Sequence, residues 1–349
     1  MEKELFQRAD GLLQRPVSRR TLLKIGIGAM GVIGLDARAG STAATIIKAR
    51  LGHGQANTTP IHRASVKFAD LVKEKSKGRL EITVFPASQL GNTTEMPEAV
   101  RLGTLEFHVA GNANIEGIAA LTGVVNLPGL FRDNDHAYRA IDTFLAKEVY
   151  EKTLLPIGIR PFGYVSNEFR QVTNSKRPIK TLADMKGLKI RVPKSKVFVD
   201  TVAAMGASPT PIDFAEVFGA LQQGVIDGQE NPLLIIYNSK LYEVQPHLAL
   251  TNHMWDLWTF HVNERFFQGL DPELQKIVLD SGKEAAAWGR DLSTKETGET
   301  LDKLKVAGMK VTEVDKQEVQ NAVKVVWDTW TGRMGQEGKT LIQRIADFK

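Results

Sequence analysis

One stretch of the chain, residues 188–232, limits the fold more than any other. It opens with LKIRV (188–192), in which apolar residues alternate with charged ones. This period of two predicts a strand. Pro193 ends the strand, because proline has no backbone N–H to donate to a neighbouring strand.

Two helices and a polar turn are predicted for the rest of this stretch. Apolar side chains recur at helical spacing in residues 196–205. A second helix is expected to start at Asp213, with Glu216 placed to complete a capping box, and to end at Gly224. The segment VIDGQENP (225–232) predicts a short strand, a glycine turn and a polar cluster.

Arg191 is the candidate binding residue of this stretch, because it lies near the carboxyl end of the predicted strand. Ligands of open α/β sheets bind outside the carboxyl ends of strands. A guanidinium there offers a planar fork of donors that matches a carboxylate. The alternative is a solvated charge at the end of a strand.

Strands and helices alternate along the first part of the chain. Strand patterns at 45–51, 80–85 and 105–110 are separated by two helical patterns. This order predicts an α/β fold with a parallel sheet covered by helices. Near the other end, Asp271-Pro272-Glu273 predicts the start of a helix that continues to about Lys305.

The first 44 residues resemble a twin-arginine (Tat) export signal. SRRTLLK (18–24) precedes a short apolar run (25–35), and Ala37-Arg38-Ala39 matches a small-residue cleavage site. We expect a signal segment at 1–39, cleaved after Ala39 or near Ala44, which would involve the Tat machinery. A cytosolic amphipathic terminus and a retained anchor are the alternatives.

Charge and composition exclude several classes of function. Residues 1–44 contain seven Lys/Arg and four Asp/Glu, so +3 of the net charge of +5 lies there and +2 remains. No basic block interleaved with aromatic residues occurs, so no nucleic-acid partner is expected. The chain has no cysteine, which excludes disulfides and thiolate chemistry.

The sequence also contains no common catalytic motif. HExxH, GxSxG and GxxxxGK[ST] are absent. Asp227 and Glu230 are three residues apart but fall in a predicted turn, and His247 and His253 lack partners at metal-ligand spacing. We therefore expect no enzymatic activity, no cofactor and no metal.

Long motifs of the chain closely resemble the solute-binding proteins of tripartite ATP-independent periplasmic (TRAP) transporters, of the dicarboxylate-binding type. They are KIRVP, GASPTPIDFAEVFGALQQGVIDGQENP, KLYEVQPHLALTNH, GRLEITVFPASQLG and FRQVTNSKRPIKTLADMKG. The resemblance covers the chain from about Thr45. It implies a two-lobed periplasmic receptor that closes on a small organic acid and delivers it to membrane permease subunits.

The resemblance also implies the division into lobes. Lobe I would comprise residues 45–167 and 257–296, and lobe II residues 168–256 and 297–349. The lobes would thus be discontinuous in sequence, joined by crossing strands, and the helix that starts at Pro272 would span both.

Four residues match binding positions of the family. The resemblance implies that Arg191 pairs with the ligand carboxylate, that Arg170 is a second cleft arginine, that Phe214 packs on the ligand and that Asn231 donates near the carboxylate. Without the resemblance they read as two surface arginines, a core phenylalanine and a turn asparagine.

Further candidates lie close to these positions or in the first lobe. Lys194 and Ser195 follow the strand of Arg191 directly. His53, Asn112, Trp255 and Trp258 are candidates for selectivity, and each has a structural alternative. Three other hypotheses remain: an exported enzyme, a binding protein of an ABC importer, and a sensor component. The acid itself is left open between dicarboxylates, keto acids, aromatic acids and sugar acids.

Overall fold

A computed structural model of the chain describes residues 46–349. The predicted signal segment and its two cleavage sites lie outside the described residues. Within this part the fold is α/β, as predicted. None of the helices there combines the length and the apolar character that a bilayer crossing requires.

The strands of the described part form one continuous pairing path. Its order is β2-β1-β3-β9-β4-β7-β5-β6, and β8 pairs with both β4 and β10. The strands are β1 (Ile47–Gly52), β2 (Leu80–Phe85), β3 (Phe107–Gly111), β4 (Ile159–Asn174), β5 (Lys189–Val192), β6 (Ser208–Pro211), β7 (Gly228–Pro232), β8 (His247–Leu250), β9 (Trp255–Asn263) and β10 (Lys310–Glu313).

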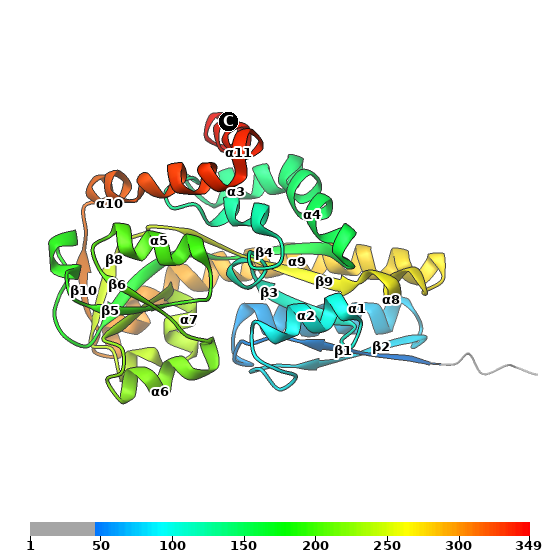
Figure 1. Ribbon diagram of the computed structural model, residues 1–349. Coiled ribbons are helices and arrows are strands. Elements are labelled where there is room, and N and C mark those ends of the chain that lie inside the picture. Colours follow the sequence, from blue (N-terminus) through cyan, green and yellow to red (C-terminus); the bar gives the residue numbers. More distant parts are fainter. Residues whose placement is uncertain (1–45) are drawn as a thin grey trace, which may run out of the picture. The chain divides into compact units, whose positions relative to one another are not determined.

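Helices connect and cover these strands (Figure 1). They are α1 (Pro60–Lys75), α2 (Glu95–Leu102), α3 (Asn134–Ala140), α4 (Lys152–Leu154), α5 (Lys196–Ala204), α6 (Val217–Gln222), α7 (Leu233–Asn238), α8 (Glu264–Gln268), α9 (Pro272–Val306), α10 (Lys316–Val323) and α11 (Val325–Asp347). A π-helix (Ile141–Glu151) joins α3 to α4.

Local capping chemistry explains the helix boundaries that the sequence predicted. The Asp271 side chain accepts from the Leu274 N–H at 2.9 Å, and Pro272 occupies the first turn of α9. Gly103 ends α2 in the left-handed conformation, with φ of 80°.

The strands fall into two groups that β4 connects. β1 pairs in parallel with β2 and β3, which confirms the predicted parallel arrangement. The first part of β4, Ile159–Phe169, pairs with β9, and its last residues, Arg170–Asn174, pair with β7. One strand therefore runs from the first group into the second, which contains β5, β6, β8 and β10.

Helix α9 runs along both groups (Figure 1) and packs on α1, β4 and α7. Two glycines allow the close approach. A Cβ at Gly282 would lie 2.2 Å from Cδ2 of Phe162, and one at Gly289 would lie 3.0 Å from Cβ of Ala64.

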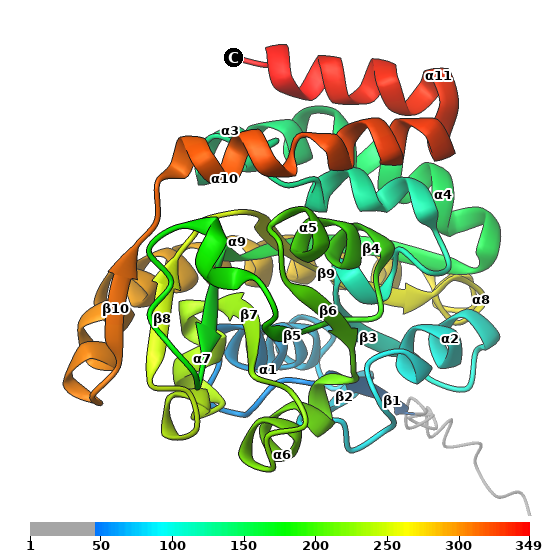
Figure 2. The ribbon, with the colours of Figure 1, turned by 60° about the vertical axis from the view of Figure 1, so that its left-hand side comes forward.

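Three apolar clusters form the core of the described part. One packs α1 and α9 on β1, β3 and β9, and another joins α6, α7 and β8 to the last turns of α9. The third joins the π-helix and α11 to β5 and α5. Figure 2 shows α10 and α11 lying beside α3 and α4 as an outer layer.

The segment GQENP corrects one sequence prediction. It was expected to be a turn and polar cluster, but it forms strand β7, which pairs antiparallel with β4 and parallel with β5. All five residues of β7 are buried. The sequence of this strand shows no alternation of apolar and polar residues, because its buried side chains are polar. They form hydrogen bonds with one another and with Arg170 inside the protein.

Candidate functional site

A small cavity of about 40 Å³ brings the four family-matched residues together. Arg170, Arg191, Phe214 and Asn231 all line it. They come from β4, β5, the turn before α6, and β7, whose ends meet here. The rest of the wall is formed by Gln55, Thr93, Gly111, Ala113, Asn114, Pro193, Ile235, Asp256 and Trp258.

Arg191 is a buried cation without a carboxylate partner in the part of the chain that the structure describes. It is 3% exposed, and its Nε donates to the Ile212 carbonyl oxygen at 2.8 Å. Burial lowers the pKa of Arg191 to about 10, although Glu230 acts in the opposite direction. Its guanidinium carbon lies 5.8 Å from the centre of the Phe214 ring. The outer guanidinium nitrogens thus remain able to pair with an anion.

Arg170 has a different environment, because its charge is already compensated. Its Nε donates to Glu230 Oε2 at 2.5 Å, and its Nη2 donates to Glu230 Oε1 at 3.0 Å and to Asn231 Oδ1 at 3.0 Å. Its Nη1 lies 3.1 Å from Asp256 Oδ2. Burial works against the charge, but the two carboxylates raise the pKa of Arg170 above its usual value. Arg170 therefore acts first as a structural centre of this wall.

Glu230 was predicted to lie in a turn, but it is a buried residue of strand β7. Its carboxylate is fully buried and also lies 3.3 Å from His253 Nε2. Burial alone would raise the pKa of Glu230, but Arg170 and His253 hold it below its usual value. His253 in turn contacts Thr251, with Nδ1 and Oγ1 2.8 Å apart. The arrangement is a satisfied buried ion network and contains no paired acid and base.

Asn231 and Phe214 complete the predicted set. The Asn231 amide donates from Nδ2 to Gln229 Oε1 at 2.5 Å, which fixes its orientation beside Arg170. Phe214 begins a short 3₁₀ turn (Phe214–Glu216), and the Asp213 side chain accepts from the Ala215 N–H at 3.2 Å. Asp213 thus acts as a cap, but the predicted capping box with Glu216 does not form among the described residues, and the predicted helix becomes α-helical only at Val217.

Lys194 and Ser195 lie outside the cavity wall. Lys194 is exposed. Ser195 caps α5 and its hydroxyl donates to Glu116. Burial raises the pKa of Glu116, although Ser195 opposes that shift.

The other selectivity candidates have mixed positions. His53 is buried, and its Nε2 lies 3.1 Å from Nδ1 of His62. The Asn112 amide donates to Asn126 at 2.6 Å and accepts from the Tyr150 hydroxyl at 2.6 Å. Trp255 donates to Asn134 at 2.8 Å inside the core. Of the four candidates, Trp258 lines the cavity.

Sequence reasoning missed several residues of the wall. Gln55 lies in the loop that leaves the carboxyl end of β1, so the rule that placed Arg191 could have found it. Asp256 lies within β9, and no pattern in the sequence marked it as a binding residue.

A polar contact closes the cavity at Thr93. Asp213 Oδ2 accepts from the Thr93 N–H at 3.2 Å and from its hydroxyl at 2.7 Å. Thr93 precedes α2 and Asp213 precedes α6, so the contact joins elements of the two strand groups.

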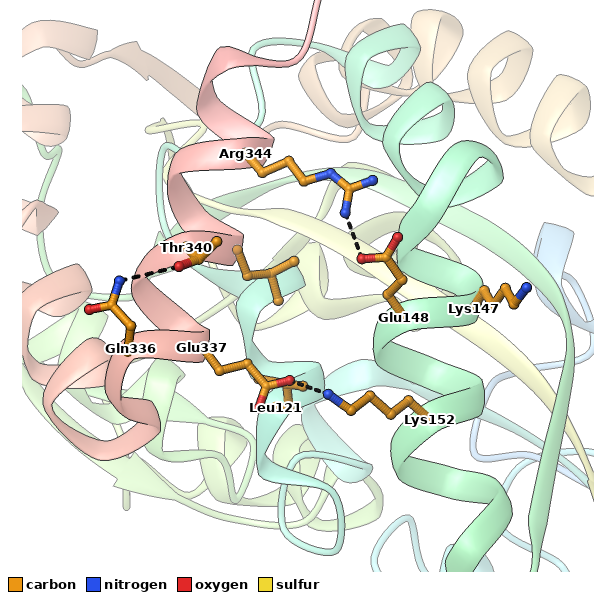
Figure 3. Close-up of a pocket in the computed structure, with 9 residues that line it drawn as sticks. Leu121, Lys147, Glu148, Lys152, Gln336, Glu337, Thr340 and Arg344 are labelled. Atoms are coloured by element: carbon orange, nitrogen blue, oxygen red, sulfur yellow. Dashed lines mark hydrogen bonds and ion pairs between the residues drawn. The ribbon is translucent and has the colours of Figure 1, made fainter.

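A larger groove of about 500 Å³ lies between α11 and the π-helix with α4 (Figure 3). Its charged side chains form ion pairs, Arg344–Glu148 at 2.6 Å and Lys152–Glu337 at 2.5 Å. None of the predicted binding residues lines it. The candidate site is therefore the small cavity.

Two connected groups of strands around a small, arginine-lined cavity are typical of two-lobed α/β binding proteins. The model of the DctP family, bacterial extracellular solute-binding protein family 7, matches residues 51–333. The chain belongs to this family, the solute-binding proteins of TRAP transporters, which confirms the resemblance seen in the sequence.

Individual relatives agree with this assignment. The 2,3-diketo-L-gulonate-binding periplasmic protein YiaO of Escherichia coli (strain K12) is 36% identical over 275 residues, which cover 78% of this chain and 84% of the relative.

Solved structures give the same result. The sugar acid binding protein DctPAm of Advenella mimigardefordensis strain DPN7T, in complex with galactonate, has a TM-score of 0.84 at 29% identity and covers 87% of this chain and 99% of its own. A TRAP periplasmic solute binding protein of Sulfurospirillum deleyianum DSM 6946 with bound succinate has a TM-score of 0.82 at 28% identity. The match covers 87% of this chain and 100% of that protein's chain.

Proposed function

We propose that this protein is a periplasmic solute-binding protein that captures a small organic acid by its carboxylate and delivers it to the membrane permease of a TRAP transporter. The observation that carries the proposal is Arg191, a buried guanidinium without an ion-pair partner among residues 46–349, which lines the small cavity. A carboxylate would accept two parallel hydrogen bonds from its outer nitrogens. Family membership supports the delivery step, and the protein is no enzyme.

Each predicted binding residue has a role in this proposal. Arg191 pairs with the carboxylate, Asn231 lies beside it, and Phe214 covers the ligand from the α6 side. Arg170 keeps Glu230 and Asn231 in place and so orients the wall. We further propose that the lobes divide as predicted, because β4 runs from one strand group to the other.

Native mass spectrometry of the purified protein tests the proposal directly. The wild-type protein should carry a small carboxylic acid from its host, and the Arg191→Ala variant should arrive empty. A wild-type protein that is loaded with a ligand lacking any carboxylate would contradict the proposal.

Export through the Tat machinery is a separate part of the proposal, and the motif SRRTLLK supports it. Replacing Arg19 and Arg20 by lysine should abolish delivery of a tagged protein to the periplasm, measured by cell fractionation. Undiminished delivery of the double variant would assign export to another route.

A further inference from the structure

The charges around the cavity limit how many carboxylates a ligand can bring into it. Two cations, Arg170 and Arg191, line the wall. Arg170 is held by Glu230 at 2.5 Å and by Asp256 at 3.1 Å, so two carboxylates already surround one guanidinium. Of the two, only Arg191 has outer nitrogens without a hydrogen-bond partner among residues 46–349. The cavity therefore offers a single place for a carboxylate.

The wall that comes from the β1 loop and from β9 is rich in acceptors. Gln55 is 3% exposed, and its Oε1 is buried with no hydrogen-bond partner among residues 46–349. Backbone contacts hold its loop, because the Gln55 N–H donates to His53 at 3.2 Å and its carbonyl accepts from Ala87 at 2.9 Å. Leaving a buried acceptor unsatisfied costs about 1–3 kcal/mol, so a donor is expected there when the site is filled.

Asp256 adds a negative charge to the same wall. It is 3% exposed, and its Oδ2 accepts from the Trp258 indole N–H at 3.3 Å, which fixes the carboxylate beside the cavity. A ligand hydroxyl can donate to such a group, whereas a second ligand carboxylate would be repelled by it. Asp256 is paired with Arg170, which Glu230 also engages, so no cation remains on this wall to compensate a second ligand carboxylate.

We infer that the ligand is a hydroxylated monocarboxylate, with its carboxylate on Arg191 and hydroxyl groups donating to Gln55 and Asp256, and that dicarboxylates are rejected. The inference rests on the proposed function and chooses between ligand classes that the family leaves open. Gln55 and Asp256 are then the residues that determine specificity.

Ligands matched in carbon number test the inference by calorimetric titration of the purified, ligand-stripped protein. Erythronate, butyrate and succinate share four carbons, and gluconate, hexanoate and adipate share six. In at least one series the hydroxy acid should bind about 100-fold more tightly than both other members, as two hydrogen bonds, one of them to a charged group, supply. A dicarboxylate that binds as tightly as the hydroxy acid of its series would overturn the inference.

Variants at Gln55 test the role of the acceptor wall. Gln55→Leu should weaken the hydroxy acid about 10-fold and leave the unsubstituted acid unchanged, since the latter has no hydroxyl to lose. Gln89→Leu is the matched control, because Gln89 is exposed on the neighbouring loop and does not line the cavity. Equal losses for both ligands in Gln55→Leu would show a merely structural role.

A gain of binding provides the sharper measurement. Gln55→Lys adds a cation to the acceptor wall, so it should raise the affinity for the dicarboxylate at least 10-fold over wild type and weaken the hydroxy acid. An unchanged dicarboxylate affinity in a variant with a normal melting temperature would contradict the charge argument.

The outcomes separate this inference from the proposed function. If dicarboxylates bind, hydroxy acids do not, and Arg191→Ala abolishes binding, the receptor function stands and the ligand class is wrong. If Arg191→Ala leaves the binding of every acid unchanged, the proposed function fails as well.

Discussion

Arg191 and Arg170 show how two arginines in one cavity take different roles. One is compensated by two carboxylates and the other by none within the described residues. The resemblance implies that Arg191 binds the carboxylate and that Arg170 is a second cleft arginine. Their surroundings support this division, in which we propose Arg191 as the anchor and Arg170 as part of the frame.

Arg191→Lys should bind nearly as poorly as Arg191→Ala. Lysine keeps the charge but cannot present two parallel donors in a plane. Loss of one partner of a desolvated pair costs about 2–5 kcal/mol, roughly 30- to 5,000-fold in affinity. Calorimetry with the native acid measures the loss, and thermal melts check the fold. Binding within about threefold of wild type would place the anchor elsewhere.

Buried histidines near the site predict a loss of stability in acid. Burial lowers the pKa values of His53 and His261 to about 3, so the folded protein keeps both neutral. Unfolded histidine titrates near pH 6.5, so their contribution is complete above that pH and is lost as the pH falls toward 3. At pH 5 each histidine should lower the free energy of unfolding by roughly 2 kcal/mol.

Urea unfolding at pH 7.5 and pH 5 isolates this effect for His261. The His261→Gln variant should lose less stability between the two pH values than wild type, by roughly 2 kcal/mol. His247→Gln is the comparison: burial also lowers the pKa of His247, but this histidine is only half-buried, so its variant should change the pH dependence less than His261→Gln does. Identical losses in wild type and His261→Gln would contradict the prediction.

Strand β7 is the element on which the site depends, and Gly228 allows its position. A Cβ at Gly228 would lie 2.1 Å from the Thr173 carbonyl oxygen, a backbone atom that cannot move without distorting β4. Gly228→Ala should therefore lower the free energy of unfolding by about 1–3 kcal/mol and weaken ligand binding.

A matched glycine gives the control for this measurement. Gly219 lies in α6, and a Cβ there meets no atom within 4 Å. Gly219→Ala should be neutral or stabilising by up to about 1 kcal/mol, because alanine favours helix. Denaturant unfolding compares the two, and equal stabilities would show that β7 has room to shift.

The sequence predicted those elements whose signals are local. Asp271 and Pro272 mark the start of α9 through their own chemistry, and the pattern of LKIRV located Arg191 near a strand end. Strand β7 could not be predicted in this way, because its polar residues are satisfied by partners distant in sequence. The compensation of Arg170 depends on Glu230 and Asp256, which only the tertiary fold brings together.

For residues 46–349 as a whole, enclosure and charge are coupled. Thr93 and Asp213 join elements of the two strand groups across the cavity, and the same enclosure buries Arg191. Opening would return water to the guanidinium. Arg191→Leu should therefore increase the enclosed fraction of the unliganded protein, seen by small-angle scattering as a smaller radius of gyration than that of unliganded wild type. An unchanged radius of gyration in a folded Arg191→Leu variant would show that the charge of Arg191 does not oppose closure.

Arg191 is buried without an ion-pair partner among the described residues, and this affects how the receptor meets the permease. Burial lowers the pKa of Arg191 to about 10, so the empty cavity disfavours its charged form. A receptor that closes without a ligand buries this charge with no anion to pair with it, which favours the open form when no ligand is bound. A bound ligand carboxylate would compensate the charge of Arg191. A permease that recognises the enclosed form would thus seldom be occupied by a receptor with nothing to deliver, and one buried arginine would serve as both anchor and cargo sensor.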